Sequence, residues 1–366
     1  MKLNKQIAQQ IVKRTMGIIH HSINVMDENG MIIASGDPNR LNQKHTGAVI
    51  ALRQNRIVEI DDELARQWQF EARAGINLPI HYLGKNWGVV GISGKPEQVR
   101  IYAELVKMTA ELIIEQHILL ENARWHHRYK EEFILQLLKG ALNPSEIEKQ
   151  ATFFEFDLSL PRTVIIVQLT HSTAEKLQEL VSYLEQSQSN QDIAILSLDQ
   201  IVILKPIAEM IYFEPTKLFA EHISPHSYKV AIGSMQSNQS LNFAYKTALA
   251  TLDYGLKYSP KKCGFFFHHA KLPILLNELS STWQSMELIQ PTSVLYQNSE
   301  NTVLRKTLAQ YFLSNCDPVH TATTLFIHPN TLRYRLAKIE QLTGLSFNRI
   351  DEKFILYLST LWQKTS

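Results

Sequence analysis

Residues 319–344 repeat apolar side chains with a helical period on both sides of a short break, which restricts the segment to two helices joined by a tight turn. In the second helix the apolar positions follow at spacings of four, three and three, so they share one face. They are Leu332, Leu336, Ile339 and Leu342. Pro329 suits the first helical turn, where a missing N–H costs nothing, and Gly344 suits the helix end. The first helix is predicted around Thr321, Ala322 and Leu325.

The outward face of the second helix is polar and basic, as DNA contact requires. Asn330 and Thr331 begin this helix, where base edges are read and free N–H groups can meet a phosphate. An ordinary amphipathic helix with a solvated basic face fits this helix equally well. The helix-turn-helix spacing and the helical patterns over residues 302–314 and 351–362 favour DNA binding. The predicted DNA-binding residues are His328, Asn330, Thr331, Arg333, Tyr334, Arg335 and Lys338.

The charge of the chain is uneven. Its net charge is +2, but residues 301–366 hold 8 Lys+Arg against 4 Asp+Glu, and residues 117–300 hold 15 against 19. The basic excess coincides with the helix-turn-helix, as phosphate contact requires. Because this excess is small, we expect a homodimer or higher homo-oligomer to bind two half-sites of double-stranded DNA.

Composition excludes several classes of protein. The hydrophobic content of 45% is typical of a globular protein, and no apolar run reaches the 18 or so residues that span a bilayer. The basic N-terminal segment lacks the uninterrupted apolar core of a signal peptide. Cys263 and Cys316 are isolated, which fits a reducing compartment. We therefore expect a cytoplasmic protein without membrane contact.

Residues 1–117 alternate between strand and helix patterns. Strands at 23–26 and 31–34 flank Glu28-Asn29-Gly30, where Asn-Gly supplies the positive φ angles of a tight hairpin. A helix over 45–55, a strand over 56–60 and a second hairpin turning near 84–86 follow. Helices beside an antiparallel sheet predict an α+β sensor of the PAS or Cache kind.

Several segments of the sequence resemble those of a known family. SINVMDENGMIIASGDPNR, GINLPI, GVVGISGKPEQVR and YAELVKMTAELIIEQ resemble the sugar diacid recognition domain, and VHTATTLFIHPNTLRYRLAKIEQLTG resembles the PucR-type helix-turn-helix. Together they resemble the sugar diacid regulator family. The resemblance implies a transcription activator, working with RNA polymerase, whose effector is glucarate, galactarate or glycerate. Two departures are Pro329, where many relatives are basic, and Leu41-Asn42, where relatives carry an aliphatic residue and glycine.

Such an effector has carboxylates and hydroxyls, which need cationic or N–H donors and small polar groups. Arg40 and His45 are candidates for a carboxylate, with Ser35, Gly36 and Asn77 as hydrogen-bonding partners. The alternative for each is a turn or cap role, which for Gly36 is the better interpretation.

Residues 97–140 have the pattern of one long helix or of two helices in tandem. This helical segment either transmits a signal to the next domain or packs on its own domain. Gly140 and Pro144 end this run. Beyond it, strands and helices follow in a β-α-β-β-α-β order, with helices at 173–186 and 215–222, typical of a ferredoxin-like, nucleotide-cyclase-like fold. The hairpin LSLDQIVIL lacks glycines and holds only Asp199 as an acid, so we predict a degenerate domain without nucleotide chemistry.

No catalytic or cofactor motif is found. The pairs His20-His21, His126-His127 and His268-His269 are expected to point apart, and no acidic or cysteine cluster completes a metal site. The fold prediction is a multidomain α+β chain: a sensor at 1–117, a connecting helix at 118–145, a GGDEF-like domain at 146–270 and a helical DNA-binding domain at 271–366. The functional prediction is a DNA-binding regulator that is not an enzyme and needs no cofactor or metal. The alternative is a ligand sensor acting through a protein partner.

Overall fold

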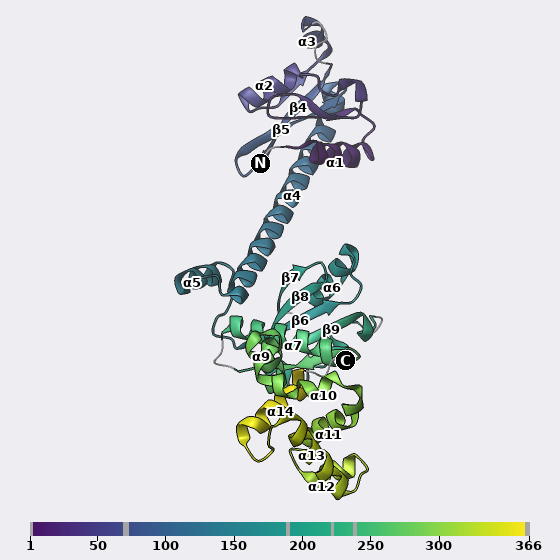
Figure 1. The fold of residues 1–366 in the computed structure, drawn as a ribbon. Helices are drawn as coiled ribbons and strands as arrows, with labels where there is room; N and C mark the ends of the chain where they lie inside the picture. Colours follow the sequence, from purple (N-terminus) through teal and green to yellow (C-terminus); the bar gives the residue numbers. More distant parts are fainter. Residues whose placement is uncertain (1–2, 69–72, 188–190, 221–222, 237–239, 363–366) are drawn as a thin grey trace. The chain divides into compact units, whose positions relative to one another are not determined.

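The computed structural model describes residues 3–68, 73–187, 191–220, 223–236 and 240–362 (Figure 1). The chain divides into two compact units, Met1–Arg128 and Tyr129–Ser366. Among the described residues, no helix is long and apolar enough to cross a membrane.

The first unit is a five-stranded antiparallel sheet in the order β2-β1-β5-β4-β3 with helices on both faces (Figure 1). Its elements are α1 (Lys5–Met16), β1 (Ile23–Met26), β2 (Ile32–Ser35), η1 (Pro38–Arg40), α2 (Thr46–Gln54), β3 (Val58–Ile60), α3 (Asp62–Gln67), β4 (Gly75–Tyr82), β5 (Lys85–Ser93) and α4 (Pro96–Lys139). The expected hairpins and the helix over 45–55 are confirmed, whereas α3 was not anticipated.

Each face of this sheet has its own core, because successive side chains on a strand point to opposite faces. Ile23 and Val25 of β1 pack with α1 and the first turns of α4. Met26 of β1 and Val89 of β5 pack with α2. This alternation sets which residues of each strand can line a site beneath α2.

Local capping explains where several elements begin. The Asp27 carboxylate accepts hydrogen bonds from the N–H groups of Asn29 and Met31, so it closes the first hairpin turn. Within this turn only Gly30 has a positive φ, of 77°, so the expectation that Asn29 shares it is wrong. Asp61 accepts from the N–H of Leu64 and caps the start of α3.

Helix α4 settles the choice between one helix and two, because it runs unbroken for 44 residues. Its first part belongs to the sensor core, where Val99, Ala103, Ala110 and Ile114 are buried. Gly140, with φ of 68°, ends it as predicted, and Asn143 then caps the unanticipated helix α5 (Pro144–Phe153) with a capping box.

The second unit begins with a five-stranded sheet in the order β10-β9-β6-β8-β7. Its elements are β6 (Arg162–Leu169), α6 (Ala174–Ser187), β7 (Asp192–Ser197), β8 (Gln200–Pro206), η2 (Ile207–Met210), η3 (Pro215–Lys217), η4 (Pro225–Ser227), β9 (Tyr228–Ile232), α7 (Leu241–Tyr258) and β10 (Gly264–Phe266). β6 lies between β8 and β9 and is antiparallel to both, as in a ferredoxin-like sheet, and β10 joins β9 in parallel.

The helix predicted over 215–222 is wrong in the residues that are described there. Only the short turn η3 forms, and Leu218 and Phe219 are buried against the sheet instead of lining one helical face. Pro215 and Gly264 are in close contact, so this segment follows the sheet edge. Tertiary packing has overridden a weak helical pattern here.

The rest of the unit is helical. Its elements are η5 (Phe267–His269), α8 (Lys271–Asn277), η6 (Glu278–Ser281), α9 (Trp283–Ile289), η7 (Gln290–Thr292), α10 (Ser293–Gln297), η8 (Ser299–Asn301), α11 (Thr302–Leu313), α12 (Pro318–Thr324), α13 (Pro329–Thr343) and α14 (Ile350–Trp362). Leu308 of α11, Ile339 of α13 and Leu356 of α14 are fully buried together and fix the position of α13.

Candidate effector site and DNA-binding helix

A row of polar residues crosses the sensor sheet on the face beneath α2. Ser35 pairs with Asn24, Asn24 with Gly91 and Gly91 with Asn77, so four neighbouring strands contribute to one line. The Ser35 hydroxyl donates to Asn24 Oδ1 at 2.6 Å. Gly91 leaves the space between the two asparagines open, because a Cβ there would lie only 2.9 Å from Asn77 Oδ1. The row is polar, although Asn24 and Asn77 are each only 2% exposed.

The first turn of α2 brings His45 to the same place. A Cβ on Gly47 would lie 2.8 Å from Asn77 Nδ2 and 3.3 Å from His45 Cε1, so all three residues meet closely. Arg40 is near enough to His45 to act on its charge. The structure therefore brings His45 and Asn77 together, and the charge of Arg40 acts on His45.

Arg40 is a largely buried cation. The residue is 8% exposed, and its guanidinium makes no hydrogen bond or ion pair within the described residues. Burial is the main cause that lowers its pKa, followed by the charge of Arg73, while Asp37 acts in the opposite direction. The Asp37 carboxylate pairs with Arg73 at 3.6 Å. A buried, unpaired guanidinium is costly and favours an anionic ligand.

His45 contributes a neutral imidazole. Burial, and then the positive charge of Arg40, lower the pKa of His45 from 6.5 to about 4. Its Nδ1 accepts from the N–H of Ala48 at 3.2 Å, which caps α2 and assigns the proton to Nε2. At neutral pH His45 is thus a hydrogen-bond donor through Nε2 and not a second cation.

This pKa predicts that acid destabilises the sensor. Between pH 6.5 and 4 the unfolded chain binds a proton on His45 that the folded chain does not, so stability is lost as the pH falls. We expect a loss of about 2 kcal/mol between pH 7 and pH 5. His45→Asn retains a capping side chain and should lack this loss. Urea unfolding of both proteins at the two pH values measures the difference, and equal losses would contradict the assignment.

Sequence reasoning missed Asn24 and Gly91, and it included a residue that lies elsewhere. Gly36 is not brought to the cluster, because a Cβ there would collide with the Met16 side chain of α1. Asn24 and Gly91 carry no local signal. A register argument would have found them, since both lie opposite strand residues that had been chosen, Ser35 and Asn77.

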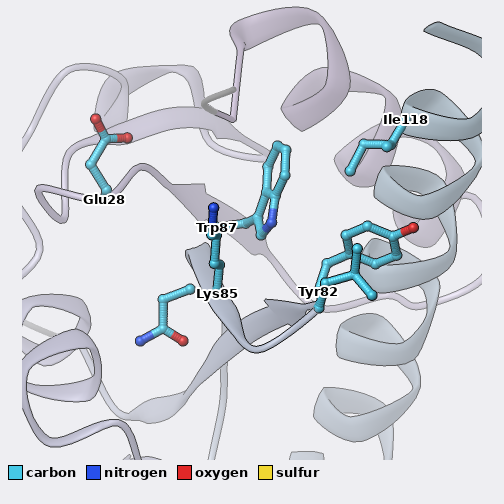
Figure 2. A pocket seen from close by; sticks show the side chains of 7 residues that line it. Glu28, Tyr82, Lys85, Trp87 and Ile118 are labelled. Atoms are coloured by element: carbon cyan, nitrogen blue, oxygen red, sulfur yellow. The ribbon is translucent and has the colours of Figure 1, made fainter. Parts of the chain in front are cut away.

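A larger hollow of about 590 Å³ opens beside the hairpin of β4 and β5 (Figure 2). Its lining residues are Glu28, Tyr82, Leu83, Lys85, Asn86, Trp87 and Ile118. Tyr82, Trp87 and Ile118 pack against the core on the α1 side, away from the polar row. None of the predicted ligand residues lines it. We favour the polar row as the effector site, because the buried Asn77 Oδ1 lacks a hydrogen-bond partner there, whereas none of the residues lining the hollow carries such an atom.

In the second unit, α13 presents a continuous outward face. Asn330, Arg333, Tyr334, Ala337 and Gln341 are exposed at spacings typical of one helical face. Ala337 and Gln341 were not predicted; the small side chain of Ala337 permits close approach to a groove. His328, Thr331 and the cap Gly344, with φ of 72°, lie where the sequence places them.

Several of the predicted DNA-binding residues are engaged within the chain. Arg335 is half-buried and donates to the Thr307 hydroxyl of α11 at 3.3 Å. The N–H groups of Asn330 and Thr331 donate to Nδ1 and to the carbonyl of His328, respectively. The expectation of free N–H groups at this helix start is therefore wrong. Lys338 contacts Gln341 at 3.0 Å and keeps its ammonium near the outward face.

No group of three or more potential metal ligands occurs in the part of the chain that the structure describes. His268 and His269 do not point apart as expected, because the short helix η5 brings their ring centroids to 4.2 Å.

Comparison with known proteins matches each part of this architecture. Residues 3–137 match the family described as putative sugar diacid recognition, residues 139–254 the GGDEF-like domain, and residues 304–362 the PucR C-terminal helix-turn-helix domain. A sensor sheet, a GGDEF-like middle domain and a helix-turn-helix on one chain define a class of transcription regulators. Within that class, the chain belongs to the carbohydrate diacid regulator family.

Three relatives illustrate the match. The carbohydrate diacid regulator of Escherichia coli is 36% identical, over 98% of this chain and 97% of that protein. A Haemophilus influenzae protein described as uncharacterized is 57% identical over 99% of both chains. The DNA-binding transcriptional activator AdeR of Bacillus subtilis is 22% identical over 62% of this chain and 58% of that protein.

Proposed function

We propose that this chain is a cytoplasmic transcription activator that binds a hydroxylated carboxylate in its sensor and operator DNA through α13. The effector proposed is glycerate, glucarate or galactarate, and the controlled genes are those for its uptake and catabolism. Support comes from the family membership and from the names of the relatives. The middle domain is proposed to have no enzymatic role, and the sensor is proposed to be of the PAS or Cache kind.

One observation carries the choice of effector. Within the described residues, Arg40, which is only 8% exposed, makes no hydrogen bond through its guanidinium, and the fully buried Asn77 Oδ1 lacks a donor. A carboxylate accepts from Arg40, and a hydroxyl on the neighbouring carbon donates to Asn77. His45 Nε2 and the Ser35 hydroxyl supply further polar contacts along the row. A 2-hydroxy acid carries one group for each of these two partners, whereas a simple anion carries a group for Arg40 alone.

The DNA-binding role rests on the outward face of α13. Arg333 is exposed and has no partner within the described residues, so it is available to a base edge. A sensor acting through a protein partner remains the competing function, and it predicts no dependence of DNA binding on Arg333. An activator would additionally contact RNA polymerase.

The test is binding of the full chain to the DNA upstream of its own gene, across a salt series, with and without each acid. We expect affinity that falls with salt and changes at least fivefold with one of the three acids. 3-Hydroxypropionate, which lacks the 2-hydroxyl of glycerate, serves as the control ligand and should have little effect. Salt-dependent binding that no acid alters would reject the effector, and absence of specific binding would reject the DNA-binding role.

A further inference from the structure

Helix α4 carries two apolar stripes on opposite faces. Residues nine apart on an α-helix are separated by two and a half turns and so point in opposite directions. Val99 and Met108 are such a pair, as are Ala103 and Leu112. In each pair the first residue is at most 1% exposed in the sensor core, while the second is more than half exposed. One stripe packs on the sheet, and the other lies on the surface.

The outer stripe has the spacing of a coiled-coil seam. Its members follow at intervals of four, three, four and seven residues and are between 46% and 74% exposed. They are Ile101, Leu105, Met108, Leu112 and Leu119. The stripe is on the order of 27 Å long at 1.5 Å per residue. Alternating intervals of three and four residues keep such a stripe in contact with a second helix along its length.

We propose that this stripe pairs with the same stripe of a second copy, in parallel, and forms the dimer interface of the protein. Burying two such stripes removes on the order of 1,000 Å² of surface, the lower limit expected of a specific interface. The pairing is isologous, as a two-fold dimer requires. The choice of a second copy as the occupant rests on the proposed binding of two DNA half-sites.

The parallel direction follows from the order of the chain. In an antiparallel pair centred on the stripe, the two α4 helices would reach Arg128 on the order of 50 Å apart and running in opposite directions. In a parallel pair both α4 helices leave the seam at the same end, so both second units follow from that end, as two neighbouring half-sites require.

Glu115 places a charged side chain within the apolar seam. It is exposed and continues the spacing between Leu112 and Leu119. A parallel pair places two Glu115 carboxylates side by side, which weakens association. The dimer is therefore expected to be of moderate affinity, and Glu115→Leu is expected to tighten it at least tenfold.

Sedimentation of the full chain, without DNA or effector, tests the interface. We expect a dimer that Leu112→Asp weakens at least 100-fold. Leu120→Asp is the matched control, because Leu120 is 50% exposed but lies about 100° around the helix from Leu119. A monomeric wild-type chain, or a dimer that resists Leu112→Asp and Glu115→Leu alike, would overturn the proposal. The proposed function fails separately, through the DNA and effector titrations.

Cysteine cross-linking tests the direction. In a background of Cys263→Ser and Cys316→Ser, Leu105→Cys and Leu119→Cys are each expected to form a disulfide with the same position of the second copy. A disulfide needs Cα atoms within about 7 Å, so both positions pair with themselves only in a parallel seam. Leu120→Cys should not cross-link. Cross-linking of Leu105→Cys only when Glu115→Cys is also present would show an antiparallel pair.

Discussion

Replacing Arg333 by alanine is expected to weaken operator binding by about 10- to 100-fold for each half-site. A bidentate contact between an arginine and a guanine contributes about 1–3 kcal/mol to discrimination. Arg333 is exposed on the outward face of α13 and has no partner within the described residues, so its removal should leave the fold intact. Fluorescence anisotropy with a labelled operator measures the loss, and thermal unfolding verifies the fold.

Arg349→Ala is the matched control for this variant. Arg349 lies in the same domain at the start of α14, is largely exposed and pairs with Glu352 at 2.9 Å. The Arg349→Ala substitution removes the same charge as Arg333→Ala but lies outside α13. We expect less than a threefold change in operator affinity. Equal losses of operator affinity in the two variants would mean that Arg333 acts only through its charge. No loss of affinity in either variant would contradict the hypothesis that α13 contacts DNA.

Replacing Arg40 by methionine is expected to abolish the response to effector while making the effector-free protein more stable. An effector at 100 times its Kd stabilises the native state by about 2.7 kcal/mol. That shift should disappear without the guanidinium. Methionine fills a similar volume and relieves the cost of a buried unpaired cation, so the effector-free variant should gain on the order of 1 kcal/mol. Thermal unfolding with and without glycerate, glucarate and galactarate measures both effects.

Arg66→Met is the control for Arg40, because Arg66 is an exposed cation of the same sensor, in the last turn of α3. It should retain the full effector shift. Arg40→Met is expected to lose the effector shift but to gain stability without effector. A variant that merely misfolds would lose both, so the two effects together identify a specific role of Arg40. An unchanged effector shift in Arg40→Met would exclude the polar row as the effector site.

The elements that the sequence predicted correctly are those with strong local causes. The first hairpin follows from Gly30 and the Asp27 cap, and α13 follows from Pro329, its apolar spacing and Gly344. The short helix α3 was missed because its six residues give too little periodicity to recognise. The prediction of a helix over residues 215–222 was wrong for the opposite reason, because packing along the sheet edge overrode a helical pattern in the residues described there.

The residues of the candidate effector site also fall into two groups, those that the sequence indicated and those that only the fold revealed. Ser35, Arg40, His45 and Asn77 were chosen for their chemistry at strand ends and helix starts, whereas Asn24 and Gly91 entered only through strand register. The state of each group also came from the fold. Nothing local indicated that His45 would be neutral or Arg40 unpaired, because both depend on the packing of α2 against the sheet.

The sequence by itself determined the order of the domains, the hairpins, the recognition helix and the family to which the chain belongs. These depend on periodicity, capping and turn residues that act over a few positions along the chain. The tertiary structure decided which polar groups are buried together, which arginine of α13 is free and which stripe of α4 remains uncovered. Those properties depend on which distant segments exclude water from each other, and no local pattern records that.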